Sequence, residues 1–492
     1  MSKLLRFTGW LLLTALVVWA LVIVFWRVAG IHPEARDLVL YLGVLPLGTF
    51  AVLRYGLNGA RKKKASGTRG ETEQSIAGRA NGGDEAPHAE PAPRIAILAS
   101  ALQLPVGGDP ASALESLAAP IAPKLHDKLK DGSGFPIFAS WARDTDTATA
   151  EQALEALDAH ADAPPAHFDE EQLRALALLI PVTQDLLQRV VSEAWLAGPE
   201  PTAPQGVHRG AASPLPGLRA TVFLPADWPA AVRERVSRWL SHEADACGIP
   251  GDQLTVEVLP ASAAGEPWQH VAAIGASPEP PAAPPTLHLL LACHSLIGER
   301  SVQRLGQSGQ LYSARQPEGI VPGEAAAGIL LLAADHDDRF AFQPRAILRA
   351  SATVRQGVSW QPRAAMGQME DLFGQTLACA PEARQKDLKA LVSDADFRKS
   401  RSTAVAGFFD AALAHLEPEG NCVTTGCGCG HAGIASPLVL IALAAEKASA
   451  AAGAVLALAV AEPDQRSIAL VLPPDPPPSG DAAIPPGNTQ AT

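Results

Sequence analysis

The stretch RQPEGIVPGEAAAGILLL, at residues 315–332, decides the fold. It ends in an apolar run, and a short run of this kind is typical of a strand that is buried on both faces. We therefore predict a core strand over residues 325–334, entered from the turn that precedes it. The run TLHLLLACH predicts a second strand of the same buried type over residues 286–294.

Strands and helices alternate on both sides of this segment. Apolar runs predict further strands at residues 94–104, 218–225, 252–260 and 467–474. Helical periodicity predicts helices at residues 170–195, 228–248, 402–416 and 436–452, with Gly248 ending the second and Ser436 as the N-cap of the last. Strands that alternate with helices predict an α/β fold around a central, buried sheet.

The segment 315–332 resembles the end of the first half of β-ketoacyl synthases and their thiolase-like relatives. In that family a DGFVxGEGAGxLVLE segment turns into a core strand, and the matching residues here are Gly319, Val321, Gly323, Glu324 and Ala325. The strand at 286–294 stands where the family has its preceding strand. The resemblance therefore implies a thiolase-like, layered α/β fold.

Two later segments extend this resemblance. VSDADFRKSRSTAVAGFF, at residues 392–409, resembles a second-half segment of synthase-like proteins. GCGCGHAGIASPLVLIALAAEKA, at 426–448, resembles the family's GHxxGAAGxxxxIxALLAL turn into a helix. Their order along the chain predicts two thiolase-like halves, at residues 94–340 and 341–475.

The first 64 residues predict a transmembrane hairpin. The run at residues 7–26 has no charge and is long enough to span a bilayer, and a second run at 38–53 follows a short turn. Lys3 and Arg6 precede the first run, and RKKK at 61–64 follows the second. Flanks rich in lysine and arginine stay in the cytoplasm. We therefore expect a multi-pass protein of the bacterial inner membrane with its soluble region in the cytoplasm.

Composition limits the other possibilities. Residues 65–93 have almost no apolar content and predict a flexible linker, and the Pro-rich residues 476–492 predict a disordered tail. The net charge of −12 argues against nucleic acid, because phosphate contacts need clustered lysine and arginine. Six cysteines in 492 residues are no disulfide framework, and disulfides are not expected in a reducing cytoplasm.

A cysteine-rich turn, GNCVTTGCGCGHAG at residues 420–433, is open to three interpretations. As a metal site it offers Cys422, Cys427, Cys429 and His431, but structural zinc sites space paired ligands two to four residues apart. As a nucleophile, a cysteine here needs a base and a lowered pKa. As a turn, the stretch uses its glycines for close backbone approach and its cysteines as small fillers. The pattern favours the turn, with no metal.

The catalytic set that the resemblance implies is incomplete. The family places a cysteine on a strand-to-helix elbow in the first half, where this chain has Ser262 and no cysteine. The family's HGT-type histidine is absent, and His431 lies out of register with its other histidine. Cys293 and His294 are adjacent on a strand and point to opposite faces. We interpret Cys293 and Cys247 as small buried hydrophobic residues. We therefore predict no cofactor and no enzymatic activity.

The layout is similar to that of adaptor proteins for lipase effectors of type VI secretion. The similar segments are PRIAILASALQLPVGGDPASALESL at residues 93–117 and DGSGFPIFASWARDTDTATA at 131–150. This resemblance implies a non-enzymatic, membrane-tethered cytosolic adaptor, with a phospholipase effector and the secretion spike as protein partners.

Two alternatives remain open. One is a membrane-associated acyl-condensing or acyl-transferring enzyme that uses Cys293 or Ser262 with His294 or His431. The other is a membrane protein that forms a homodimer through an edge strand of its sheet.

Overall fold

The computed structural model of the chain describes residues 92–119, 121–157, 167–192, 216–276, 285–333, 343–356, 362–463 and 465–475. These residues belong to one unit, Ala89–Thr492. The predicted membrane spans at 7–26 and 38–53, residues 65–91 of the predicted linker and the tail at 476–492 lie outside the described residues. So does the predicted boundary between the halves at residue 340. All of these remain predictions.

Ten strands form one mixed sheet. Along the chain they are β1 (Arg94–Gln103), β4 (Gly217–Pro225), β5 (Leu254–Ala261), β6 (Thr286–Ser295), β7 (Glu324–Ala333), β8 (Ala346–Gln356), β9 (Leu388–Ser393), β10 (Cys422–Thr424), β11 (Ala454–Ala459) and β12 (Gln465–Leu472). In space their order is β10-β9-β11-β12-β8-β1-β7-β6-β4-β5.

The strand order repeats on the two sides of the β1–β8 pair. On one side β4 pairs in parallel with β5 and β6, and β7 runs antiparallel to β6 and β1. On the other side β9 pairs in parallel with β10 and β11, and β12 runs antiparallel to β11 and β8. The strands β1 and β8 meet antiparallel at the centre. Each side therefore has three parallel strands, whose carboxyl ends share one edge.

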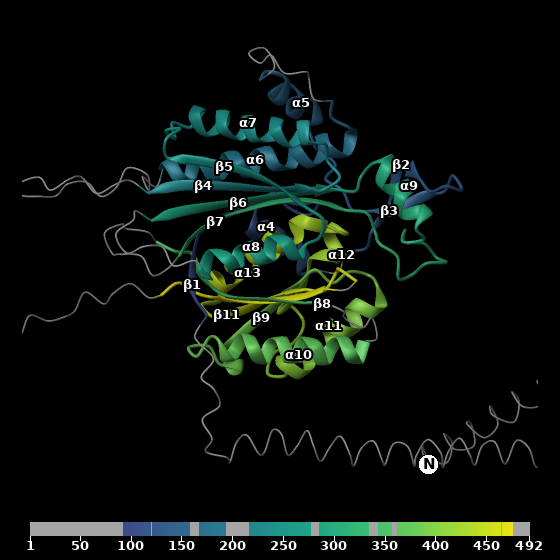
Figure 1. Ribbon diagram of the computed structural model, residues 1–492. Helices are drawn as coiled ribbons and strands as arrows, with labels where there is room; N and C mark the ends of the chain where they lie inside the picture. The colour runs from purple at the N-terminus through teal and green to yellow at the C-terminus, as the bar shows by residue number, and fades with distance from the viewer. Residues whose placement is uncertain are drawn as a thin grey trace, which may run out of the picture. The chain divides into compact units, whose positions relative to one another are not determined.

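Helices cover the sheet on both faces and also fill the space between its two sides (Figure 1). The outer layer over β4–β7 contains α5 (Thr147–Glu155), α6 (Glu170–Ser192) and α7 (Ala230–Ala246). The outer layer of the other side contains α10 (Pro362–Ala378) and α11 (Lys399–Ala412). Between the two sides lie α4 (Pro110–Leu117), α8 (Gly265–Ala276), the short α12 (Thr425–Cys429) and α13 (Ser436–Ala451).

Five smaller elements complete the described part of the chain. A two-stranded sheet of β2 (Lys124–Lys130) and β3 (Pro136–Ala139) packs with α9 (Glu299–Gln307). Short 3-10 helices lie at Gln385–Asp387 and Gly433–Ala435.

Helix α13 is buried on almost every side because its sequence is apolar almost all round. The segment Gly433–Ala451 and helix α6, Glu170–Ser192, are the described helices long and apolar enough to cross a membrane. Of their most apolar windows, 72% and 50% are buried inside this fold. Burial of this extent is that of core helices, so neither segment bears on the predicted hairpin.

The N-cap prediction for Ser436 is wrong. The N-cap of α13 is Ala435, because the 3-10 turn at Gly433–Ala435 leads directly into the helix. The Ser436 hydroxyl instead donates to the buried Asp394 carboxylate at 2.9 Å. The predicted stop of α7 is confirmed, since Gly248 has a φ of +86° just beyond the helix end.

Glu324, in the stretch that decides the fold, begins β7 and is fully buried. Arg174 of α6 donates to it through Nε at 3.0 Å and Nη2 at 2.5 Å. The Ala142 N–H and the Ser295 hydroxyl donate to the same carboxylate at 2.8 and 2.9 Å. Because both oxygens are hydrogen-bonded twice, the buried charge is compensated. Glu324 thus joins a helix, a loop and two strands.

Candidate functional site

A cavity of about 670 Å³ opens at the carboxyl ends of parallel strands from both sides of the sheet. From the first side it is lined by residues at the ends of β4, β5 and β6, which include Pro225, Ser262 and His294. From the second side the segments after β9 and β11 and the turn before α13 contribute Arg398, Arg401, His431, Gly433 and Glu462. Ligands of open α/β sheets bind at this edge, so the cavity is the candidate functional site.

His294 lies near the end of β6, and its Nδ1 accepts a hydrogen bond from the Ile434 N–H at 3.2 Å. A neutral imidazole has one N–H, so this bond leaves the proton on Nε2. Burial, together with the nearby His431 and Arg304, lowers the pKa of His294 to about 3. His294 is therefore a neutral hydrogen-bond donor at neutral pH.

The close approach of His294 requires a glycine at position 433. A Cβ at Gly433 would lie 1.9 Å from the His294 Nδ1, and the backbone there has a φ of +49°. The sequence pattern GHAG before an apolar helix thus serves the placement of this imidazole.

His431 enters the cavity from the cysteine-rich turn. Its backbone N–H donates to the Val321 carbonyl at 3.0 Å, which fixes the turn against the segment before β7. Burial lowers the pKa of His431 to about 4, as does Arg398, while Asp396 and Asp394 oppose the shift. The imidazole is therefore neutral at neutral pH.

The two ring nitrogens of His431 differ in their surroundings. Its Nε2 lies 4.0 Å from Oε1 of Glu462, whereas its buried Nδ1 has no hydrogen-bond partner within the described chain. A proton on Nε2 faces the carboxylate and leaves a lone pair on Nδ1. The Glu462 carboxylate therefore favours a proton on Nε2 of His431, whereas the hydrogen bond from the Ile434 N–H leaves the proton of His294 on its Nε2.

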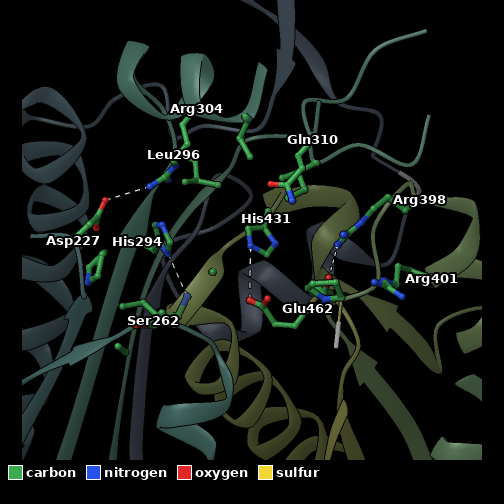
Figure 2. A pocket seen from close by; sticks show the side chains of 18 of the residues that line it. Asp227, Ser262, His294, Leu296, Arg304, Gln310, Arg398, Arg401, His431 and Glu462 are labelled. Atoms are coloured by element: carbon green, nitrogen blue, oxygen red, sulfur yellow. Dashed lines mark hydrogen bonds and ion pairs between the residues drawn. The ribbon is translucent and has the colours of Figure 1, made fainter. Parts of the chain in front are cut away.

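Ser262 follows β5 and precedes α8, at the strand-to-helix elbow that the sequence predicts. Its backbone N–H donates to Oε1 of Glu266 at 2.9 Å, and the residue is exposed at the cavity. In Figure 2, Ser262 lies on the same side as His294 and Asp227, with His431 between them and the two arginines.

The opposite wall is basic. Arg398 Nε donates to both oxygens of Asp396 at 2.9 Å, and its Nη2 donates to the Ala461 carbonyl at 2.8 Å. Arg401, one helical turn further along α11, is buried. On the first side, Arg304 forms an exposed ion pair with Asp227 at 3.2 Å.

Cys293 does not reach the cavity. It is fully buried in the apolar cluster between β6 and the outer helices, and burial raises the pKa of its thiol. Cys247 packs at the edge of the same cluster, and burial likewise raises its pKa. Of the adjacent pair Cys293 and His294, only the imidazole faces the site.

The cysteines of the turn are likewise separated from the cavity. Burial raises the pKa of Cys422 to about 11 and that of Cys429 to about 12, and it also raises the pKa of Cys427. None of the described residues that line the cavity is a cysteine. The described ranges also contain no cluster of three or more His, Cys, Asp or Glu placed to hold a metal ion. His431 lines the cavity without these thiols.

Sequence reasoning named Ser262, His294 and His431, and all three line one cavity. It missed Arg401 and Glu462 as site residues. Their positions in the sequence could have identified them, because Arg401 follows the apolar run that forms β9 and Glu462 follows the one that forms β11.

The chain was compared with known proteins. No protein-family model matches it, and no curated protein matches it. Among solved structures, the ishigamide ketosynthase/chain length factor is 17% identical with a TM-score of 0.47, over 77% of this chain and 99% of that one. A β-ketoacyl synthase from Burkholderia phymatum is 12% identical with a TM-score of 0.48, over 77% and 99%.

A third solved structure is the ketosynthase from module 1 of the bacillaene synthase of Bacillus amyloliquefaciens. It is 12% identical with a TM-score of 0.48, over 79% of this chain and 75% of that one. The solved structures to which the chain is similar are thus ketosynthases. The predicted α/β class is confirmed by the mixed sheet and the helices on its faces.

The comparison also corrects a prediction. The expectation that the chain is not an enzyme does not hold against these likenesses, which are all to ketosynthases. The resemblance to secretion adaptors finds no support among these structures.

Proposed function

We propose that the protein is an acyl-transferring enzyme in which Ser262 carries the acyl group. One observation carries this proposal: a serine and two imidazoles that are neutral at neutral pH line the same cavity. Acyl transfer needs a nucleophile, a base and a donor to the developing oxyanion.

The three side chains take distinct roles. His431 Nδ1 accepts the proton of the Ser262 hydroxyl, and Oγ adds to the carbonyl carbon of an acyl thioester. The Nε2–H of His294 donates to the oxyanion that forms. When the carbon–sulfur bond breaks, His431 returns its proton to the leaving sulfur, and an ester remains on Ser262. Glu462, whose Oε1 lies 4.0 Å from Nε2 of His431, stabilises the imidazole while it carries the proton of the serine.

The assignment to serine follows from the thiols. A thiol attacks as thiolate, and burial raises the pKa of Cys293, Cys422 and Cys429. None of these thiols lines the cavity. The Ser262 hydroxyl is exposed there, and an adjacent base can activate a hydroxyl at its ordinary pKa.

The test is the incubation of the purified full chain with hexanoyl-CoA, followed by intact-mass measurement and peptide mapping. We expect one hexanoyl adduct on Ser262, absent from Ser262→Ala. Ser308→Ala, an exposed serine outside the cavity, is the matched control and keeps the adduct. His431→Gln is expected to slow acylation by about a hundredfold. An adduct on a cysteine, or none on Ser262, contradicts the proposal.

A second proposed role is the carriage of a lipase effector to the secretion spike, with residues 7–26 and 38–53 holding the protein at the inner membrane. One surface supports it: the β2–β3 hairpin exposes Leu125 and Phe135, which are 51% and 67% exposed. Exposed apolar side chains of this size suit protein contact. Co-purification of a co-expressed lipase with the full chain, lost in Phe135→Ser, tests this role. A lipase that co-purifies equally with Phe135→Ser argues against this surface.

A further inference from the structure

Arg401 is a buried cation without a direct partner. It is 6% exposed and lines the cavity from α11. Its Nε is buried and has no hydrogen-bond partner, and its guanidinium makes no ion pair within the described residues. Figure 2 shows it beside Arg398, across the cavity from Ser262.

The carboxylates closest to Arg401 are bonded elsewhere. Asp396 holds Arg398 through both oxygens. Asp394 accepts hydrogen bonds from the Ser436 hydroxyl and from two backbone N–H groups, those of Val460 and Ala461. Glu318 accepts from the N–H and the hydroxyl of Ser400, at the first turn of α11. These carboxylates act on Arg401 only through space.

This arrangement is energetically unfavourable for the guanidinium of Arg401. An arginine stays protonated at neutral pH, and a buried charge that lacks a hydrogen-bonded partner is costly. Burial lowers the pKa of Arg401, and Arg398 lowers it further. The planar guanidinium matches the two oxygens of a carboxylate or phosphate. An anionic ligand would supply the missing partner.

The remaining lining of the cavity is partly apolar. Leu296, Leu305, Ile320 and Ile434 all contribute to it. A ligand that satisfies both surfaces has an oxyanion at one end and a hydrocarbon part beside it. We infer that the cavity binds the carboxylate or phosphate of a small amphipathic molecule through Arg401. The inference concerns the same cavity as the proposed acyl transfer but needs no reaction at Ser262.

The test is calorimetric titration of the full chain, held in amphipol, with hexanoate, monohexyl phosphate and hexanol. These probes share one chain and differ in head group. We expect one or both anions to bind at least about tenfold more tightly than hexanol. The tighter anion identifies the head group as carboxylate or phosphate. Equal binding of all three probes overturns the inference.

Three variants locate the effect. Arg401→Gln is expected to bind all three probes equally, whereas Arg401→Lys keeps part of the anion preference. Arg304→Gln, which removes a cavity arginine already paired with Asp227, keeps the full preference. Ser262→Ala also keeps it, so failure of acylation and failure of anion binding are distinguishable.

Thermal unfolding without ligand separates an anion-binding role from a structural one. Removal of an unpaired buried charge is expected to leave the Tm of Arg401→Gln equal to or above that of the wild type. A lower Tm together with an unchanged anion preference would show that Arg401 is structural and would overturn the inference. If Arg401→Gln fails to fold, the anion preference of the wild type against hexanol still decides.

Discussion

The cysteine-rich turn at residues 420–433 and the cavity beside it contrast in how they are assembled. The turn gathers three thiols within eight positions, yet burial raises the pKa of each. The cavity gathers Ser262, His294 and Arg401 from segments far apart in the sequence. The cysteines of the turn are therefore close in sequence because small residues pack there. The side chains of the site are brought together instead by the ends of parallel strands.

The glycines of the turn explain its composition. A Cβ at Gly426 would lie 2.6 Å from the Asp394 carbonyl oxygen and 2.7 Å from that of Ala395. A Cβ at Gly428 would lie 2.7 Å from Cδ2 of Leu117. The turn must pass this closely to bring His431 into the cavity, so small residues fill it.

The largest expected effect is that of Gly426→Ala. The new methyl group meets backbone oxygens, which cannot rotate away, so either the turn or β9 has to shift. We expect a loss of about 3 kcal/mol in the free energy of unfolding, measured by urea denaturation. Because His431 follows in the same turn, acylation of Ser262 should slow as well.

The matched control is Gly374→Ala in α10, where a Cβ meets nothing within 4 Å. Alanine favours a helix over glycine, so this variant should unfold at an equal or slightly higher urea concentration. Equal stability of both variants would show that the turn accommodates a methyl group at position 426. Close backbone contact would then not be the reason for the glycine there.

The next effect concerns the cavity and its response to acid. The pKa of His294 is lowered to about 3 and that of His431 to about 4, so the unfolded chain binds their protons first as the pH falls below about 6.5. Stability from these groups is thus present above pH 6.5 and is lost toward pH 4. Each imidazole contributes a slope of up to about 1.4 kcal/mol per pH unit, or about 2 kcal/mol by pH 5.

Urea denaturation between pH 7.5 and 5 measures this slope. His294→Gln and His431→Gln should each flatten it, and the exposed His242→Gln should leave it as in the wild type. If the slope of His431→Gln matches that of the wild type, His431 is not held neutral, and its role as proton acceptor fails with it.

The sequence predicted the buried core better than the site. The core strand expected at 325–334 is β7, Glu324–Ala333, and the helix expected at 436–452 is α13, Ser436–Ala451. Both are uninterrupted apolar runs, in which local pattern and burial agree. The helix expected at 402–416 instead spans Lys399–Ala412, because Glu318 binds the Ser400 N–H at its start. A cap supplied from a distant segment leaves no local pattern.

The same reason limits prediction of the site. Ser262 and His294 were found because each ends a recognisable strand. The role of Arg401 depends on which carboxylates are already bonded, and Asp394 is bonded by residues some 40 to 67 positions away. Such partnerships exist only after both sides of the sheet have packed.

The smallest expected effect is that of Cys427→Ala in the turn. Its sulfur makes a long contact, 4.0 Å to the Ala395 carbonyl oxygen, and a hydrogen bond with Thr424, and it does not line the cavity. A weak thiol contact of this kind contributes little, so we expect a change of under about 1 kcal/mol in urea denaturation and unchanged affinity for the anions. Loss of acylation or anion binding in a folded Cys427→Ala protein would make the thiols of the turn part of the site, and the contrast between these thiols and the cavity would disappear.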